Sequence, residues 1–230
     1  MRVISVVSPK GGVGKTTTGL ILAGEIADAG GKVSIIDADP NTPFKLWSSL
    51  SGPVKNIKVV TDVTEDSIVD EIEAAKGHSK FVIVDLEGTA NMTVSYAIAH
   101  SDFALVPTQG SQLDAIEAVK AVKQIRRVEK GFKIKIPHAL VFTRTSAAIT
   151  PRTYKHIYNE MRELGMDILD SQVIDREAYR ALFSIGGTLH GLKTSDVSNL
   201  PAAKENAAAL IEEIIKKMAP KKAKRKKKAA

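Results

Sequence analysis

Short apolar runs alternate with longer segments of mixed polarity along most of the chain. Runs such as residues 33–36 and 81–84 are almost entirely apolar, which is typical of parallel strands buried on both faces. The apolar runs predict strands at residues 2–7, 32–37, 57–60, 81–85, 103–107, 138–143 and 168–174. The segments between them predict helices at residues 15–29, 66–76, 111–130, 151–164, 176–184 and 201–218. This alternation predicts an α/β fold, a doubly wound, mostly parallel sheet flanked by helices.

A glycine-rich loop follows the first predicted strand and carries the clearest chemistry in the sequence. Residues 10–17 read KGGVGKTT. Glycines let backbone N–H groups close around phosphate oxygens, a lysine adds positive charge at the outer phosphates, and a threonine hydroxyl can hold Mg²⁺. The start of the following helix adds its positive dipole end. We therefore predict nucleotide binding at Lys10, Gly11, Gly12, Val13, Gly14, Lys15, Thr16 and Thr17.

Three aspartates follow two other predicted strands. Asp37 and Asp39 come after the second strand, and Asp85 ends the fourth. Ligands of such sheets bind beyond the carboxyl ends of the strands, where acids can hold Mg²⁺ or orient a water for attack on a γ-phosphate. For the first two aspartates, an Asp-Pro turn capped by its own side chain is the alternative. The phosphate loop favours a metal site, which we predict at Thr16, Asp37 and Asp85.

The glycine-rich loop departs from the usual P-loop pattern, and the departure points to one family. The common pattern has glycine six residues before the lysine, where this chain has Pro9. Lys10 precedes the glycines instead, so two lysines flank the loop, which resembles the deviant P-loop of the ParA/MinD family of partitioning ATPases. The resemblance implies a P-loop NTPase fold, ATP and Mg²⁺ as cofactors, and hydrolysis to ADP and phosphate. It also implies that Lys10 reaches the nucleotide of a partner subunit.

The acidic segment at residues 36–40, Ile-Asp-Ala-Asp-Pro, is similar to the segment that follows the P-loop in ParA proteins. In that family the second aspartate is tied to the attacking water and the first to the metal region. The resemblance therefore gives these roles to Asp39 and Asp37. It implies Lys10, Lys15 and Asp39 as the catalytic residues.

Two further segments carry the resemblance along the chain. Residues 106–114 resemble a family stretch that lies near the nucleotide and the dimer interface, although Ser111 is also explained as a helix N-cap. Arg144 closes the sixth predicted strand, where relatives have a polar or basic residue that contacts the nucleotide base. A solvated arginine is the alternative at this position, and the sequence leaves both open.

Positive charge is concentrated at one end of the chain. The net charge is +7, and residues 216–230 hold nine lysines and arginines and no acid, so residues 1–215 carry −2. We therefore predict an ATPase domain at residues 1–218 and a basic, disordered tail at residues 219–230. The tail has only Ala, Pro, Lys and Arg, which leaves little to insert into a membrane and favours non-specific contact with DNA phosphates. A solubilising tail is the alternative.

A second basic set lies at residues 126–135, at the end of the third predicted helix. It either extends the DNA footprint or is an ordinary solvated helix end. The sequence leaves these two interpretations open.

Together these features predict an ATP-hydrolysing partition or positioning protein. By resemblance, Mg-ATP brings two subunits together as a homodimer that binds DNA, and a ParB-like or cargo adaptor protein stimulates hydrolysis. The cargo would be a plasmid, a chromosome or a large protein assembly. We expect a cytoplasmic, nucleoid-associated protein, since the chain has no cysteine and no apolar run of about 20 residues. The alternatives are a P-loop ligase that phosphorylates a small carboxylate and a site-specific accessory ATPase of DNA transfer.

Overall fold

The computed structural model describes residues 1–89, 91–149 and 151–219. Within them seven strands form one sheet in the order β3-β2-β4-β1-β5-β6-β7, and every neighbouring pair is parallel. The predicted α/β fold is therefore confirmed. The strands are β1 (Arg2–Val6), β2 (Val33–Ala38), β3 (Ile57–Val60), β4 (Phe81–Leu86), β5 (Phe103–Thr108), β6 (His138–Thr145) and β7 (Val173–Ile174).

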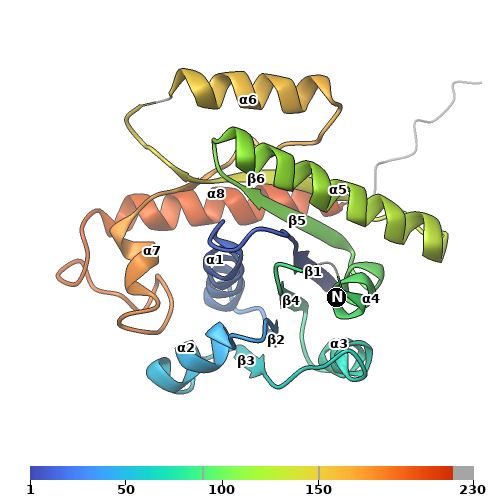
Figure 1. The fold of residues 1–230 in the computed structure, drawn as a ribbon. Coiled ribbons are helices and arrows are strands. Elements are labelled where there is room, and N and C mark those ends of the chain that lie inside the picture. The colour runs from blue at the N-terminus through green and yellow to red at the C-terminus, as the bar shows by residue number, and fades with distance from the viewer. Residues whose placement is uncertain (90, 150, 220–230) are drawn as a thin grey trace, which may run out of the picture.

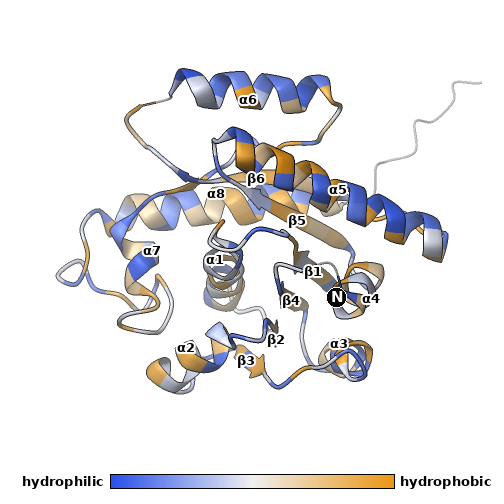
Figure 2. Ribbon diagram, in the orientation of Figure 1, coloured by the Kyte–Doolittle hydropathy of each residue, from blue (hydrophilic) through white to orange (hydrophobic). Residues whose placement is uncertain are grey.

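Helices cover both faces of the sheet (Figure 1). Helices α1, α2, α7 and α8 pack against one face, and α3, α4, α5 and α6 pack against the other. Figure 2 shows apolar residues gathered along the central strands and hydrophilic residues along the outer sides of α5 and α6. The helices are α1 (Lys15–Asp28), α2 (Pro43–Ser51), α3 (Ile68–Lys76), α4 (Met92–Ala99), α5 (Gln112–Phe132), α6 (Arg152–Glu163), α7 (Glu177–Ala181) and α8 (Leu200–Met218).

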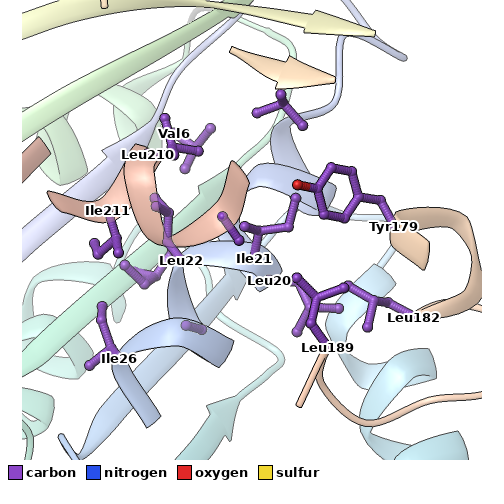
Figure 3. Packing of buried hydrophobic residues seen from close by; sticks show 14 of the residues in the cluster. Val6, Leu20, Ile21, Leu22, Ile26, Tyr179, Leu182, Leu189, Leu210 and Ile211 are labelled. Atoms are coloured by element: carbon purple, nitrogen blue, oxygen red, sulfur yellow. The ribbon is translucent and has the colours of Figure 1, made fainter. Parts of the chain in front are cut away.

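Helix α1 is buried on nearly all sides, since the sheet covers one side of it and α8 much of the other. Figure 3 shows Leu20 and Leu22 of α1 close to Leu210 of α8 and Leu189 of the preceding loop. Each fully buried leucine contributes about 1.5–3 kcal/mol through the removal of apolar surface from water. This packing fixes the position of α1, and with it the glycine-rich loop that leads into the helix.

Two short helices, α2 and α4, were not predicted. Both contain eight or nine residues, too few for a clear apolar period. Helix α4 starts at Asn91, whose side chain accepts a hydrogen bond from the Val94 backbone N–H at 2.9 Å. Helix α2 buries Trp47, which donates from its ring N–H to the Gly187 carbonyl at 3.0 Å. Trp47 is therefore a packing residue.

The last strand is much shorter than the predicted segment 168–174. Only Val173–Ile174 forms β7, and Ile168 makes a single bridge to Leu140. Between them the backbone N–H groups of Asp170 and Ser171 donate to the Glu213 carboxylate of α8, each at 2.8 Å. A side chain thus satisfies backbone groups that a longer strand would have paired with its neighbour. Helix α7 also ends three residues before its predicted boundary, at Ala181.

Candidate phosphate and metal site

The glycine-rich loop lies at the carboxyl end of β1, between β4 and β5. The strand order changes direction around β1, which makes this edge the expected ligand crevice of the sheet. Gly12 and Gly14 have φ of +74° and +93°, in the left-handed region that favours glycine. Gly14 is also the N-cap of α1, so the dipole of that helix begins at the loop.

Side chains from two distant strands hold the loop in place. Thr143 of β6 donates to the Val13 carbonyl at 2.7 Å, and Gln109, just after β5, donates to the Gly12 carbonyl at 3.1 Å. These contacts fix the conformation of the loop. The backbone N–H groups of its three glycines have no hydrogen-bond partner among the described residues, so they are open to a ligand. This role of Thr143 could not be predicted from the sequence, since 130 residues separate it from Val13.

Thr16 and Asp85 meet beside the loop, as the predicted metal site requires. The Thr16 hydroxyl donates to Asp85 Oδ2 at 2.7 Å. Asp85 has no solvent exposure, and burial raises its pKa to about 7 against the opposing effects of the Thr16 hydroxyl and Lys15. Among the described residues, Oδ1 of Asp85 and Oδ1 of Asp37 are buried without a hydrogen-bond partner. Such orphaned carboxylate oxygens fit Mg²⁺, which prefers oxygen ligands.

Asp37 also has a structural task that the sequence did not reveal. Its Oδ2 accepts the backbone N–H groups of Phe44 and Lys45 at 2.9 and 3.1 Å. These are the first-turn donors of α2, whose own N-cap, Thr42, makes no side-chain cap. Burial raises the Asp37 pKa, and these backbone donors oppose the shift. One oxygen thus caps a helix, while the other has no hydrogen-bond partner among the described residues.

The residues described hold no cluster of three His, Asp or Glu side chains arranged for a metal. A Mg²⁺ ion at this place would therefore be held by Thr16, Asp37 and Asp85, with phosphate oxygens or water as its other ligands.

Asp39 forms the side-chain-capped turn that was the alternative interpretation of this segment. Its Oδ1 accepts from the backbone N–H and the side-chain amide of Asn41, both at 2.9 Å. The residue is half-buried at the mouth of the site. The turn uses only Oδ1, so it is compatible with the predicted contact between Asp39 and an attacking water.

Lys10 is held within its own chain by α5. Its ammonium lies 2.6 Å from Oδ1 of Asp114, a carboxylate with only 3% side-chain exposure. Ser111 caps α5 by accepting the Asp114 backbone N–H at 3.2 Å, and its hydroxyl donates to Oδ2 of the same carboxylate. The predicted N-cap role of Ser111 is confirmed. A contact between Lys10 and a buried carboxylate 104 residues away was not predicted.

A cavity of about 450 Å³ opens on the side of the loop away from Asp85. It is lined by Gly14 and Thr17, by Arg144, and by the segment from Val173 to Phe183. Arg144 is exposed, has φ of +52°, and also borders a second cavity of about 280 Å³ beside α5 and α6. The segment after β7, for which the sequence predicted no chemistry, forms one wall of the larger cavity.

Helices that could cross a membrane are absent from the part of the chain that the structure describes, because none is both long and apolar enough.

Residues 1–220 match the family described as VirC1 protein. The chain is 40% identical to Protein ParA of Rhizobium radiobacter over 218 residues, which is 95% of this chain and 98% of that protein. It is 24% identical to Protein virC1 of the same organism over 187 residues, or 79% of this chain and 80% of the relative.

Solved structures share the fold at low sequence identity. Apo McdA from Cyanothece superposes with a TM-score of 0.71 at 17% identity, covering 90% of this chain and 99% of that one. MinD from Aquifex aeolicus superposes with a TM-score of 0.67 at 19% identity, covering 93% of this chain and 98% of that one. A plasmid partition protein from Borrelia burgdorferi bound to AMPPNP superposes with a TM-score of 0.67 at 17% identity, covering 94% of this chain and 99% of that one.

Proposed function

The chain belongs to the VirC1 family, within the ParA/MinD group of P-loop ATPases, and on that premise we propose that it is a partition or positioning ATPase that dimerises on Mg-ATP. The solved relatives that carry nucleotide, such as the partition protein bound to AMPPNP, support the choice of ATP. The adapter and the cargo are those predicted by resemblance, a ParB-like or cargo-bound protein and a large DNA or protein assembly.

The single observation that carries the proposal is the arrangement around the glycine-rich loop. Lys15 lies at the start of α1, Thr16 contacts Asp85, and the backbone N–H groups of the loop glycines have no partner among the described residues. Mg²⁺ bound at Thr16 and Asp85 would neutralise charge on the transferred phosphoryl group. In this proposal Lys15 binds the outer phosphates and Asp39 orients the attacking water.

The cavity beside Gly14 has room for the base and sugar of the nucleotide. A volume of about 450 Å³ falls within the usual range of small-molecule sites. Arg144 borders this cavity, which supports its assignment as a base contact over a purely solvated role. The Nε of Arg176, buried and without a partner among the described residues, is a further polar group at this wall.

Dimerisation is proposed to exchange one partner of Lys10 for another. In the single chain Asp114 holds the ammonium, and in the dimer the phosphates of the partner's nucleotide would take its place. ATP can favour the dimer only through contacts that ADP does not make, and a lysine on the outer phosphates is such a contact. Exposed apolar side chains at the same edge, Leu113 at 70% and Met92 at 46% exposure, support a subunit interface there.

Substitution of Lys10 tests the proposal. We expect Lys10→Ala to abolish dimerisation with ATP, because the contact across subunits is lost, while nucleotide binding in each chain remains. Light scattering with ATP and with ADP measures the first property, and a fluorescent nucleotide analogue measures the second. Lys15→Ala is the matched control, which should lose nucleotide binding itself. Dimerisation of Lys10→Ala at the wild-type level would overturn the role of Lys10.

DNA binding by the proposed tail has a separate test. Deletion of residues 219–230 should weaken retention of DNA and flatten its dependence on salt, because fewer counterions are released. An unchanged affinity and salt slope would show that the tail is no DNA element. Binding that survives excess bulk DNA would instead favour a site-specific accessory ATPase.

A further inference from the structure

Helix α5 carries a row of cations on its solvent-facing side. Lys123, Arg126, Arg127 and Lys130 stand at positions i, i+3, i+4 and i+7, which share one face of a helix. Lys133 follows directly at the C-cap, and all five residues are exposed. The opposite side of the helix is buried against the sheet through residues such as Val122, Ile125 and Val128. We call these five cations the α5 stripe, and Figure 2 shows the hydrophilic character of this end of the helix.

The α5 stripe is not neutralised by acids. In residues 1–89, 91–149 and 151–219, no carboxylate lies within 4.0 Å of the charged groups of its five members. The nearby lysines behave differently, since Lys120 pairs with Glu117 at 2.7 Å and Lys135 lies 3.7 Å from Glu129. An ordinary solvated helix places acids among its bases at i+4 spacing, which stabilises the helix. Glu129 stands four residues before Lys133, but its carboxylate accepts the Ile136 backbone N–H at 2.9 Å and faces Lys135 instead of the stripe.

The stripe and the end of helix α8 lie at the same edge of the sheet. Helix α5 starts at Ser111 near the glycine-rich loop and ends before β6, at the amino ends of the strands. Helix α8 ends there as well, because Arg2 at the start of β1 donates to the Ile215 carbonyl at 3.3 Å. Figure 1 shows α5 and α8 running toward the same side of the molecule. Residues 220–230 of the predicted tail lie outside the described residues, but α8, which leads into them, ends at the edge toward which the stripe extends.

We infer that the α5 stripe binds the backbone phosphates of double-stranded DNA, as a second contact beside the tail. The inference rests on the DNA binding in the proposed function and assigns it a surface on the folded domain. A helix rises 1.5 Å per residue, so the stripe spans about 15 Å, a length over which duplex DNA presents about nine negative charges. Among the described residues the side chains of the stripe have no ion-pair partner, so all five cations are available to phosphates, and contacts to phosphates alone carry no sequence preference.

An anionic membrane is a poorer partner for this surface. Membrane-binding helices need bulky apolar residues beside their cations. The exposed apolar residue at this end of α5 is Phe132, whose ring packs edge-on against Tyr96 of α4 at 6.5 Å between centroids. The stripe thus offers charge with little apolar area, which is what phosphate groups of DNA require.

The test compares two full-length variants that lose the same charge. The first variant replaces Lys123, Arg126, Arg127 and Lys130 by Gln. The matched control replaces four exposed lysines without ion pairs outside the stripe by Gln, namely Lys55, Lys58, Lys155 and Lys193. DNA binding is measured with ATP on a duplex of arbitrary sequence over a range of salt concentrations. Circular dichroism and ATP hydrolysis without DNA verify that both variants are folded and active.

We expect the stripe variant to lose about 3 to 4 units from the slope of log affinity against log salt, and the control to lose much less, because each phosphate contact contributes about 0.9. If the wild type binds DNA and the two variants have equal slopes, the DNA-binding role of the stripe is overturned and the proposed function stands. Absence of DNA binding by the wild type would overturn both. Loss of binding to phosphatidylserine vesicles, with DNA binding intact, would overturn the DNA assignment in favour of a membrane.

Discussion

The charged side chains at the two ends of helix α5 differ in burial and in pairing. At its first turn Asp114 is buried, and both of its oxygens are occupied, one by Lys10 and the other by Ser111. At its last turns the cations of the α5 stripe are exposed and without carboxylate partners among the described residues. Buried charges need fixed partners because their desolvation is costly, so they hold a precise geometry. Exposed charges keep their hydration, so they have little desolvation cost, and their electric field attracts a polyanion from a distance.

The same contrast separates the two edges of the sheet. The carboxyl edge contains nearly all the buried charged groups, including Lys15, Asp37, Asp85 and Asp114. The amino edge receives the ends of α5 and α8, with cations that face solvent. Substitutions at the carboxyl edge should therefore change both stability and ligand binding, and those at the amino edge should change binding of polyanions alone.

Asp37 should give the largest effect, because it serves α2 and the metal site together. We expect Asp37→Ala to destabilise the protein by about 1–2 kcal/mol, the usual cost of a lost helix cap, and to weaken Mg²⁺-dependent nucleotide binding. Asp37→Asn keeps an oxygen that accepts the N–H groups of Phe44 and Lys45 but loses the charge. Urea unfolding and nucleotide titrations with and without Mg²⁺ measure the two effects. Equal destabilisation by both variants would contradict the separation of the two roles.

Substitution of Asp114 should give an intermediate effect. It tests whether this buried carboxylate keeps the Lys10 ammonium from its proposed contact in the dimer. Asp114→Asn removes the negative charge that holds the ammonium, so we expect dimerisation at lower ATP concentrations. The loss of stability should be about 1 kcal/mol or less, since the Lys10 side chain is 38% exposed and the pair is partly screened. Light scattering across an ATP titration checks the first effect and thermal unfolding the second. Ser111→Ala is a control that removes the cap but keeps the carboxylate. A higher ATP requirement in Asp114→Asn would contradict the exchange of partners.

Glu25 should give the smallest effect and is an exception to the contrast, because it is a buried acid on the side of α1 far from the loop. Burial raises its pKa above the ordinary 4.5, against opposing effects of His190 at 2.8 Å and of Lys204, and Asp28 adds to the rise. Because the folded-state pKa is raised, the stabilising contribution is complete below pH 4.5 and is lost as the pH rises through the folded value.

The variant Glu25→Gln removes this titration while its amide oxygen can still accept from His190. We expect the wild type to lose stability relative to the variant between pH 4.5 and neutrality. Urea midpoints at pH 5 and pH 7.5 measure this difference. A parallel dependence of both proteins on pH would show that Glu25 contributes nothing to it.

The sequence predicted the larger elements well because their signals are local. Near-continuous apolar runs identified six strands closely, and the glycines and lysines of residues 10–17 identified the phosphate loop. Helices α2 and α4 were missed because each is short and is specified by a cap, and the α2 cap comes from Asp37, six residues before the helix begins. The strand predicted at 168–174 was too long because Glu213, far along the chain, takes its backbone donors.

By itself the sequence determined the succession of the seven strands and of six of the eight helices described, the loop that fits a phosphate, and the concentration of charge at the chain end. Periodicity and glycine content act over a few residues, so they can be read without a fold. Only the tertiary structure decided that Thr143 holds the loop, that Asp114 holds Lys10, and that the α5 stripe has no carboxylate partner among the described residues. The first two features are contacts between residues more than a hundred positions apart, and the third is a lack of such contacts. All three depend on how the two helical layers pack on the sheet.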